Sequence, residues 1–174
     1  NALKSTISRL KIDLPPSPFV AGIYARVDST RGVWKAPANI SINAVSSPSV
    51  QISHSDQEDL NVNAVSGKSI NAIRSFPGKG VLVWGARTLD GNSNEWRYIN
   101  VMRTTIMIKE SIRLAMQHLV FEPNANQTWT TAKAMIEHYL NLLFRAGALA
   151  GARPAEAFNV RVGLGETMTN TDIL

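Results

Sequence analysis

The sequence lacks cysteine altogether and contains three histidines among its 174 residues. Without cysteine, a disulfide framework, a thiolate zinc site and a cysteine nucleophile are all excluded. The histidines form no metalloprotease motif, because Glu137-His138 has no second histidine at the required helical spacing. We therefore predict no metal site and no thiol-dependent catalysis.

Long apolar runs are missing as well. None reaches the roughly 20 residues that a helix needs to span a bilayer, so we predict no membrane insertion. No signal peptide is visible at the start of the chain. The chain begins at Asn1 rather than at a methionine, and it stops at Leu174 where a new segment begins. We expect it to be a domain of a longer protein.

Charge of one sign is not concentrated anywhere. Lysine and arginine number 18 against 13 aspartates and glutamates, which gives a net charge of +5. The basic residues are scattered and make no run of the kind that forms a nucleic-acid-binding arm. The favoured interpretation is a solvated surface, and an acidic partner or nucleic acid is the alternative.

Complete catalytic motifs are absent too. The sequence has no Gly-x-Ser-x-Gly nucleophile elbow. Gly67-Lys68-Ser69 resembles the end of a phosphate-binding loop, but the position five residues before the Gly-Lys pair holds Val62 instead of glycine. We predict no catalytic residue, no cofactor and no enzymatic activity.

Periodicity and chain breakers predict the main elements. The short apolar run at residues 81–84 follows Gly78 and Gly80, which is typical of a buried strand. Residues 100–120 and 128–147 each place apolar side chains on one helical stripe and polar ones on the opposite stripe. Smaller predicted elements are an extended lead-in at 1–14, a helix at 18–28 capped by Ser17, β-like segments at 41–45, 50–54 and 70–76, a helical turn capped by Ser55-Asp56, a strand at 158–162 and the start of another at 172–174.

These elements indicate an α+β fold. We predict a mixed β-sheet packed against two long α-helices, with an irregular N-terminal region that contains a short helix. We expect the sheet to be incomplete at the C-terminal end. The whole chain, residues 1–174, is interpreted as one domain with an extended lead-in or linker at 1–14.

Several phrases of the sequence resemble contractile phage tail sheath proteins and related contractile injection systems. Residues 84–88 read Trp-Gly-Ala-Arg-Thr, and residues 96–103 read Trp-Arg-Tyr-Ile-Asn-Val-Met-Arg. Further phrases in the same order as in that family lie at residues 15–28, 31–39, 71–80, 121–124, 147–151, 154–160 and 169–172. The resemblance therefore extends over roughly residues 15–172 and concerns a sheath-forming C-terminal domain.

The resemblance implies a structural role. Sheath subunits of that family surround a tail tube in stacked rings, contract to eject the tube, and exchange terminal strands with neighbouring subunits. The implied partners are identical subunits, the tube protein, and baseplate and terminator proteins, with no nucleic acid. The implied location is a virion tail or contractile particle, assembled after synthesis in the bacterial cytoplasm.

Two sets of residues are candidates for specific roles. By resemblance, the late helix faces the tail tube, so its polar stripe is the candidate interface; a solvated face is the alternative. That stripe consists of Lys133, Glu137, Asn141 and Arg145. Arg87 and Arg103 lie within the recurrent phrases, and we interpret them as structural arginines that bridge backbone carbonyls or acidic groups.

Two other classes of function stay open. Alternation of strands and helices, together with Gly67-Lys68-Ser69, is compatible with a nucleotide-binding or enzymatic α/β domain. The charge of +5 is compatible with a nucleic-acid-binding module, which would bind DNA with a steep salt dependence. A structural sheath subunit is the favoured hypothesis because each alternative depends on a single feature.

Overall fold

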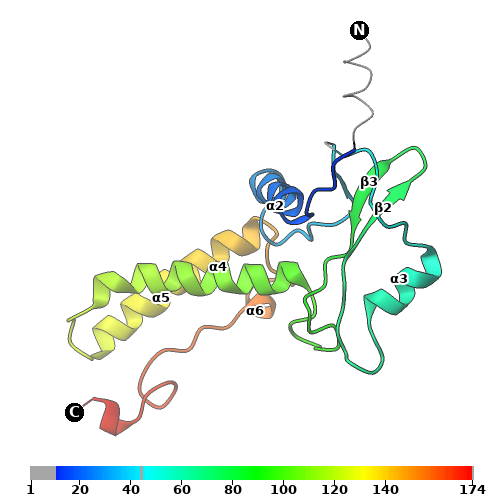
Figure 1. Cartoon of the computed structure of the whole chain (residues 1–174). Coiled ribbons are helices and arrows are strands. Elements are labelled where there is room, and N and C mark those ends of the chain that lie inside the picture. The colour runs from blue at the N-terminus through cyan, green and yellow to red at the C-terminus, as the bar shows by residue number, and fades with distance from the viewer. Residues whose placement is uncertain (1–10, 44, 174) are drawn as a thin grey trace. The chain divides into compact units, whose positions relative to one another are not determined.

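A computed structural model describes residues 11–43 and 45–173 of the chain (Figure 1). The chain divides into two compact units, Asn1–Met102 and Arg103–Leu174. The lead-in predicted for residues 1–14 lies mostly outside the described residues. Its last four residues, 11–14, are exposed and have no regular secondary structure.

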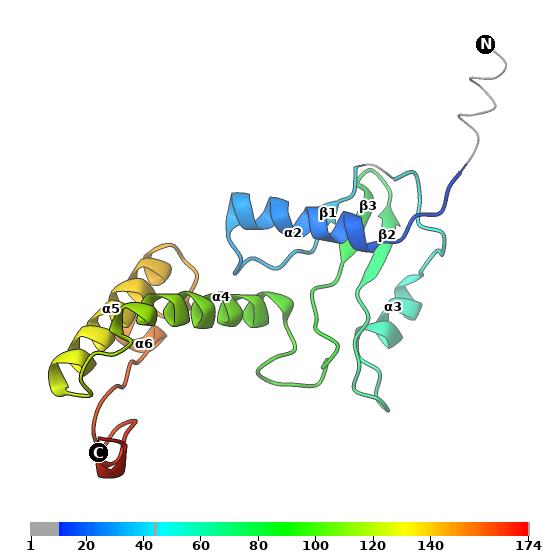
Figure 2. The same cartoon turned by 60° about the vertical axis from the view of Figure 1, so that its left-hand side comes forward.

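The first unit is built around a sheet with the strand order β1-β3-β2 (Figure 2). The central strand β3 (Gly80–Trp84) pairs with the whole of β2 (Ala72–Phe76) and with β1 (Ile40–Ser41). Three consecutive residues of β3 are buried, since an unbroken apolar run supplies both faces of a strand with core residues. The strands predicted at 70–76 and 81–84 are confirmed.

Helix α2 (Ser17–Arg31) packs on this sheet (Figure 2). Its buried residues Ile23 and Val27 join Ile42, Val81 and Val83 in one apolar cluster. The helix predicted at 18–28 is confirmed and is longer than predicted. The prediction that Ser17 caps it is wrong: Ser17 is the first helical residue, and Pro16 holds the cap position without a side-chain hydrogen bond. Pro18, near the start of the helix, has no N–H, so the first turn has one fewer donor to satisfy.

Helix α3 (His54–Asn61) has a capping box at its start. The Ser53 hydroxyl accepts a hydrogen bond from the Asp56 N–H at 3.2 Å, and Asp56 Oδ2 accepts one from the Ser53 N–H at 2.9 Å. The helical turn predicted here is confirmed, but its cap is Ser53 rather than Ser55. The β-like segment predicted at 50–54 is wrong, because Ser53 already serves as the helix cap.

The second unit contains most of α4 (Ile99–Ala115), the 3₁₀-helix η1 (Met116–Leu119) and α5 (Asn126–Arg145). Both long helices are confirmed, although the first one tightens into η1 in its last turn. The Tyr139 hydroxyl on α5 donates to Ser111 Oγ on α4 at 3.1 Å. Helix α5 ends in a Schellman motif, in which Gly147 N–H donates to the Phe144 carbonyl and Ala148 N–H to the Leu143 carbonyl.

The C-terminal segment differs from its prediction. Helix α6 (Pro154–Ala157) is followed by an irregular stretch, so the strand predicted at 158–162 is wrong. Val160 is the one buried residue of that stretch, and no strand pairs with the stretch among the described residues. The strand predicted to start at Asp172 is also wrong, because Thr169 and Asp172 form a capping box for the 3₁₀-helix η2 (Asn170–Asp172).

The α+β class predicted for the chain is confirmed, with helices in both units and the sheet in the first. In the described residues both strand pairs of the predicted mixed sheet are antiparallel. The short turn between β2 and β3 requires their antiparallel pairing, because a tight hairpin can join only antiparallel strands.

Candidate functional site

The four residues of the predicted interface stripe lie at successive i, i+4 positions along α5, and therefore on one face of the helix. Lys133 Nζ lies 3.9 Å from Glu137 Oε1, and Asn141 Nδ2 donates to the Glu137 backbone carbonyl at 2.9 Å. Arg145 is exposed in the last turn, where a cation is favoured by the helix dipole. The stripe therefore offers two cations with one carboxylate between them.

The burial pattern of α5 separates this stripe from an apolar face. Ala132 and Leu140 are buried, whereas the Lys133 and Glu137 side chains are 46% and 43% exposed. An ion pair with this much exposure contributes little stability, since solvent screens it. Lys133 and Glu137 are thus available to a partner at small cost to the fold.

The two candidate structural arginines are both half-buried. Arg87 Nη1 donates to the Gly91 carbonyl at 3.1 Å, and its guanidinium carbon lies 5.8 Å from the centre of the Tyr98 ring. The Arg87 backbone N–H donates to the Asn71 side chain at 2.9 Å. Arg103 lies in α4. A structural role for both arginines stays a prediction.

One anchoring residue was missed by the sequence analysis. Asn124 accepts a hydrogen bond from Trp129 Nε1 at 2.6 Å and donates to the Asp172 carbonyl at 2.8 Å. It therefore ties the C-terminal segment to the start of α5. No local sequence signal indicates this role, because Asn124 and Asp172 are 48 positions apart and become neighbours only through the fold.

Two carboxylates have pKa values below the ordinary aspartate value. Hydrogen bonds from the Ser53 hydroxyl and backbone N–H lower the pKa of Asp56. The pKa of Asp172 is lowered by hydrogen bonds from the Thr169 backbone N–H and hydroxyl. Both carboxylates belong to capping boxes at the start of a helix. The lowered pKa values therefore reflect local structure rather than acid–base catalysis.

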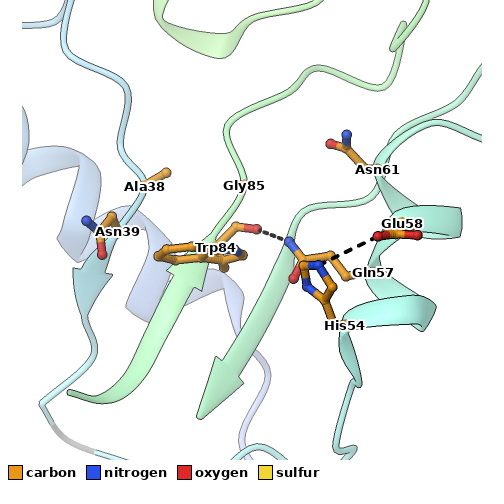
Figure 3. A pocket seen from close by; sticks show the side chains of 8 residues that line it. All are labelled: Ala38, Asn39, His54, Gln57, Glu58, Asn61, Trp84 and Gly85. Carbon is orange, nitrogen blue, oxygen red and sulfur yellow. Dashed lines mark hydrogen bonds and ion pairs between the residues drawn. The ribbon is translucent and has the colours of Figure 1, made fainter. Parts of the chain in front are cut away.

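A pocket of about 410 Å³ lies in the first unit between α3 and the ends of β1 and β3 (Figure 3). Gln57 Nε2 donates to the Trp84 carbonyl at 3.0 Å, and Gln57 also accepts a hydrogen bond from Arg74. His54 Nε2 lies 3.6 Å from Glu58 Oε1. The pocket is open, and the His54 and Glu58 side chains are 88% and 73% exposed, so these groups have no buried environment that would prepare them for chemistry.

The segment Gly67-Lys68-Ser69 is a turn followed by an extended chain. Lys68 pairs with Asp90 in an isolated β-bridge, and the Ser69 hydroxyl donates to the Asn61 carbonyl. A phosphate-binding loop leads directly into a helix whose N-terminus faces the phosphate. Here β2 follows instead, so the geometry does not support nucleotide binding.

Within residues 11–43 and 45–173, no group of three or more histidine, cysteine, aspartate or glutamate side chains is arranged to hold a metal ion. Over the same ranges, every helix is too short or too polar to cross a bilayer.

Comparison with protein families identifies the chain. The phage tail sheath protein central domain matches residues 2–89, and the phage tail sheath C-terminal domain matches residues 92–171. The chain belongs to the phage tail sheath family. The resemblance on which the sequence analysis relied is therefore confirmed.

Two curated relatives are tail sheath proteins of bacteriophages. The protein of Burkholderia phage BcepMu is 29% identical over 142 residues, which are 79% of this chain and 29% of the relative. The protein of Vibrio phage KVP40 is 26% identical over 130 residues, which are 73% of this chain and 19% of the relative. The chain thus spans less than a third of either relative.

Solved structures of contractile injection systems are more similar. A chain in the 6-fold symmetrised anti-feeding prophage baseplate is 45% identical with a TM-score of 0.87, and the match covers 93% of this chain and 44% of that one. A chain in the contracted PVC sheath complex of an extracellular contractile injection system is 42% identical with a TM-score of 0.87, over 94% of this chain and 45% of that one. A chain in the contracted helical sheath of the anti-feeding prophage is 44% identical with a TM-score of 0.83. That match covers 93% of this chain and 44% of the other.

These matches define the class of protein. The chain is a member of the phage tail sheath family, and chains similar to it occur in sheath and baseplate structures of contractile systems.

Proposed function

We propose that the chain is a non-enzymatic subunit of a contractile tail sheath, which self-assembles around a tail tube and ejects that tube by contraction. The observation that carries this proposal is the 44% identity to a chain of a contracted helical sheath, over 93% of this chain. We treat residues 1–174 as a single assembly module, since α4 (Ile99–Ala115) runs without interruption across the boundary between the two compact units.

Exchange of terminal strands would link the subunits. The support is the outer edge of β2, with which no strand pairs in the part of the chain that the structure describes. An exposed edge of this kind binds an added strand through main-chain hydrogen bonds. A terminal segment of a neighbouring subunit is the proposed ligand.

The register of the sheet identifies a backbone donor on that edge. Ile42 N–H donates to the Val81 carbonyl at 2.9 Å, so the backbone polar groups of Val81 face β1. Ser75 is the partner of Val81 in β2. In an antiparallel pair both residues face each other or both face away, so the Ser75 N–H and carbonyl point to the open edge.

The remaining partners follow from the same proposal. The α5 stripe of Lys133, Glu137, Asn141 and Arg145 is the proposed contact with the tail tube, and baseplate and terminator proteins are proposed at the ends of the sheath. Nucleic acid and membrane are not among the proposed partners. Synthesis in the bacterial cytoplasm without a signal peptide belongs to the same proposal.

The test is electron microscopy of the protein as encoded in its genome, expressed alone and together with its tube protein. We expect regular hollow tubes or sheathed tubes. Ser75→Pro removes the outward N–H without touching the β2–β3 ladder, so it should abolish the tubes. Ser75→Thr keeps the N–H and should assemble normally.

Thermal melting of both Ser75 variants controls for the fold. Dispersed subunits in every condition would contradict the sheath proposal. Normal tubes from a folded Ser75→Pro variant would contradict strand addition at β2 and leave the sheath proposal standing.

A further inference from the structure

The turn between η1 and α5 presents two apolar side chains to solvent. Val120 is 56% exposed and Phe121 is 101% exposed. Phe121 also has φ of 72°, in the left-handed region that bulky residues rarely occupy. A fully exposed aromatic side chain in a strained conformation is unfavourable for an isolated subunit, and such strain is concentrated at functional positions.

The backbone around this turn is held in place. Val120 N–H donates to the Gln117 carbonyl at 3.4 Å, and Glu122 N–H donates to the Leu119 carbonyl at 3.2 Å. A few residues further on, Asn124 is tied to Trp129. Phe121 is thus presented on a fixed support, which lowers the entropy lost when an aromatic anchor is buried.

The first unit carries a groove of about 380 Å³, whose lining combines apolar side chains with the serines of one loop. The groove lies between the start of α2, the sheet and the loop at residues 45–52. Its floor is continuous with the core of the unit, because Ile42 and Val81 belong to the buried apolar cluster. Phe19, Val45 and Ile73 are partly buried side chains on its walls.

We propose that Val120 and Phe121 of one copy insert into this groove on a second copy. The inference rests on the proposed sheath function. A helical array requires contacts between two different patches of the same chain, because a patch that binds itself closes a dimer. The exposed pair and the groove are two such different patches, and both contain apolar side chains. Insertion would remove the side chains of Val120 and Phe121 and the apolar lining of the groove from water.

The size of the contact indicates that it acts within an array. An aromatic residue buries about 150–250 Å², whereas a stable pairwise interface takes about 800 Å² per partner. The contact is therefore too small to hold a dimer, and it contributes once other contacts place the copies side by side. The expected occupant is a neighbouring sheath subunit rather than a free partner.

Chemical crosslinking in assembled tubes tests the contact. The described chain contains no cysteine, so single cysteines can be introduced at Phe121 and at Ser47 on the groove wall, with any cysteine elsewhere in the encoded protein replaced by serine. Tubes assembled from a mixture of Phe121→Cys and Ser47→Cys subunits are treated with a short bismaleimide. We expect a covalent dimer that is absent when Lys35→Cys, an exposed position outside the groove lining, replaces Ser47→Cys.

A second variant separates assembly from folding. Phe121→Gly suits the left-handed backbone, so the melting temperature should stay or rise. The same variant loses the aromatic anchor, so the concentration needed for tube formation should rise about tenfold.

Three outcomes are distinguishable. The specific crosslink together with the Phe121→Gly defect supports the contact. Tubes of the mixed Phe121→Cys and Ser47→Cys subunits that show no crosslink, or a Phe121→Gly variant that assembles like wild type, would overturn the contact and leave the sheath proposal intact. Absence of wild-type tubes in every condition overturns the sheath proposal, and the contact with it.

Discussion

At the scale of single residues, the charge on Asp56 stabilises the start of α3. The Ser53 hydroxyl donates to the Asp56 carboxylate at 2.6 Å, and the Ser53 N–H donates at 2.9 Å. These bonds keep the pKa of Asp56 lower in the folded chain than in the unfolded chain. The stabilisation is therefore complete above the ordinary aspartate pKa, about 4, and disappears as the pH falls through the lowered folded value.

We predict that the first turn of α3 opens in acid. Amide hydrogen exchange at Ser53 and Asp56 should accelerate as the pH falls below about 4, after correction for the intrinsic exchange rate. Asp56→Asn should show faster exchange already at pH 7, with a weaker acid dependence. Asp59→Asn is the matched control, because Asp59 is an exposed aspartate of the same helix outside the capping box. Equal exchange in both variants at pH 7 would contradict the assignment.

At the scale of helices, two exposed glycines have opposite expected effects. Gly147 follows α5 with φ of 80°, and no atom lies within 4 Å of a Cβ added there. Gly22 lies inside α2, again with nothing within 4 Å. Any effect of alanine at either position is therefore conformational rather than steric.

We predict that Gly147→Ala destabilises the fold by about 1 kcal/mol, because alanine is strained in the left-handed conformation. Gly22→Ala should stabilise it by up to about 1 kcal/mol, because alanine is the better helix former. Urea unfolding followed by circular dichroism measures both changes. Gly147→Asn should lose less than Gly147→Ala, since asparagine tolerates positive φ. A lower free energy of unfolding in Gly22→Ala would contradict this prediction. It would show that a side chain at position 22 clashes with another part of the folded protein.

The sequence predicted the elements whose pattern is local. It did not predict the features that depend on contacts between distant parts of the chain. Residues 81–84 and the two long helices follow directly from apolar periodicity. The alternation of Phe158, Val160 and Val162 has the period of a strand, but a strand also needs a partner, and periodicity does not provide one. The Asn124 anchor was missed for the same reason, since its partner Asp172 lies far along the chain.

The candidate site was predictable only in part. The i, i+4 spacing of Lys133 and Glu137 places both on the predicted stripe, and in the structure Lys133 Nζ lies 3.9 Å from Glu137 Oε1. Spacing does not reveal whether a polar stripe binds a partner or is only solvated. An interface stripe and a solvated stripe are both exposed in a single chain. The tube-facing assignment therefore depends on the family resemblance and stays a prediction.

At the scale of the whole molecule, the charges of the α5 stripe can be moved without changing their sum. Exchanging Lys133→Glu with Glu137→Lys keeps the net charge and the i, i+4 pair. The exchange places the acid N-terminal to the base, which is the more favourable order, so stability should stay or rise by about 0.2–0.5 kcal/mol. If the stripe contacts the tail tube, cosedimentation of the protein with preformed tubes should fall, because the charges no longer meet their partners.

A matched exchange on α4 distinguishes position from chemistry. Glu110 and Arg113 form an exposed ion pair with side chains 54% and 59% exposed, and neither belongs to the α5 stripe. Glu110→Arg with Arg113→Glu should leave cosedimentation unchanged. Both exchanges conserve net charge. A decrease in cosedimentation with the α5 exchange alone would therefore result from the positions of the charges on α5. An equal decrease with both exchanges would assign tube binding to another surface.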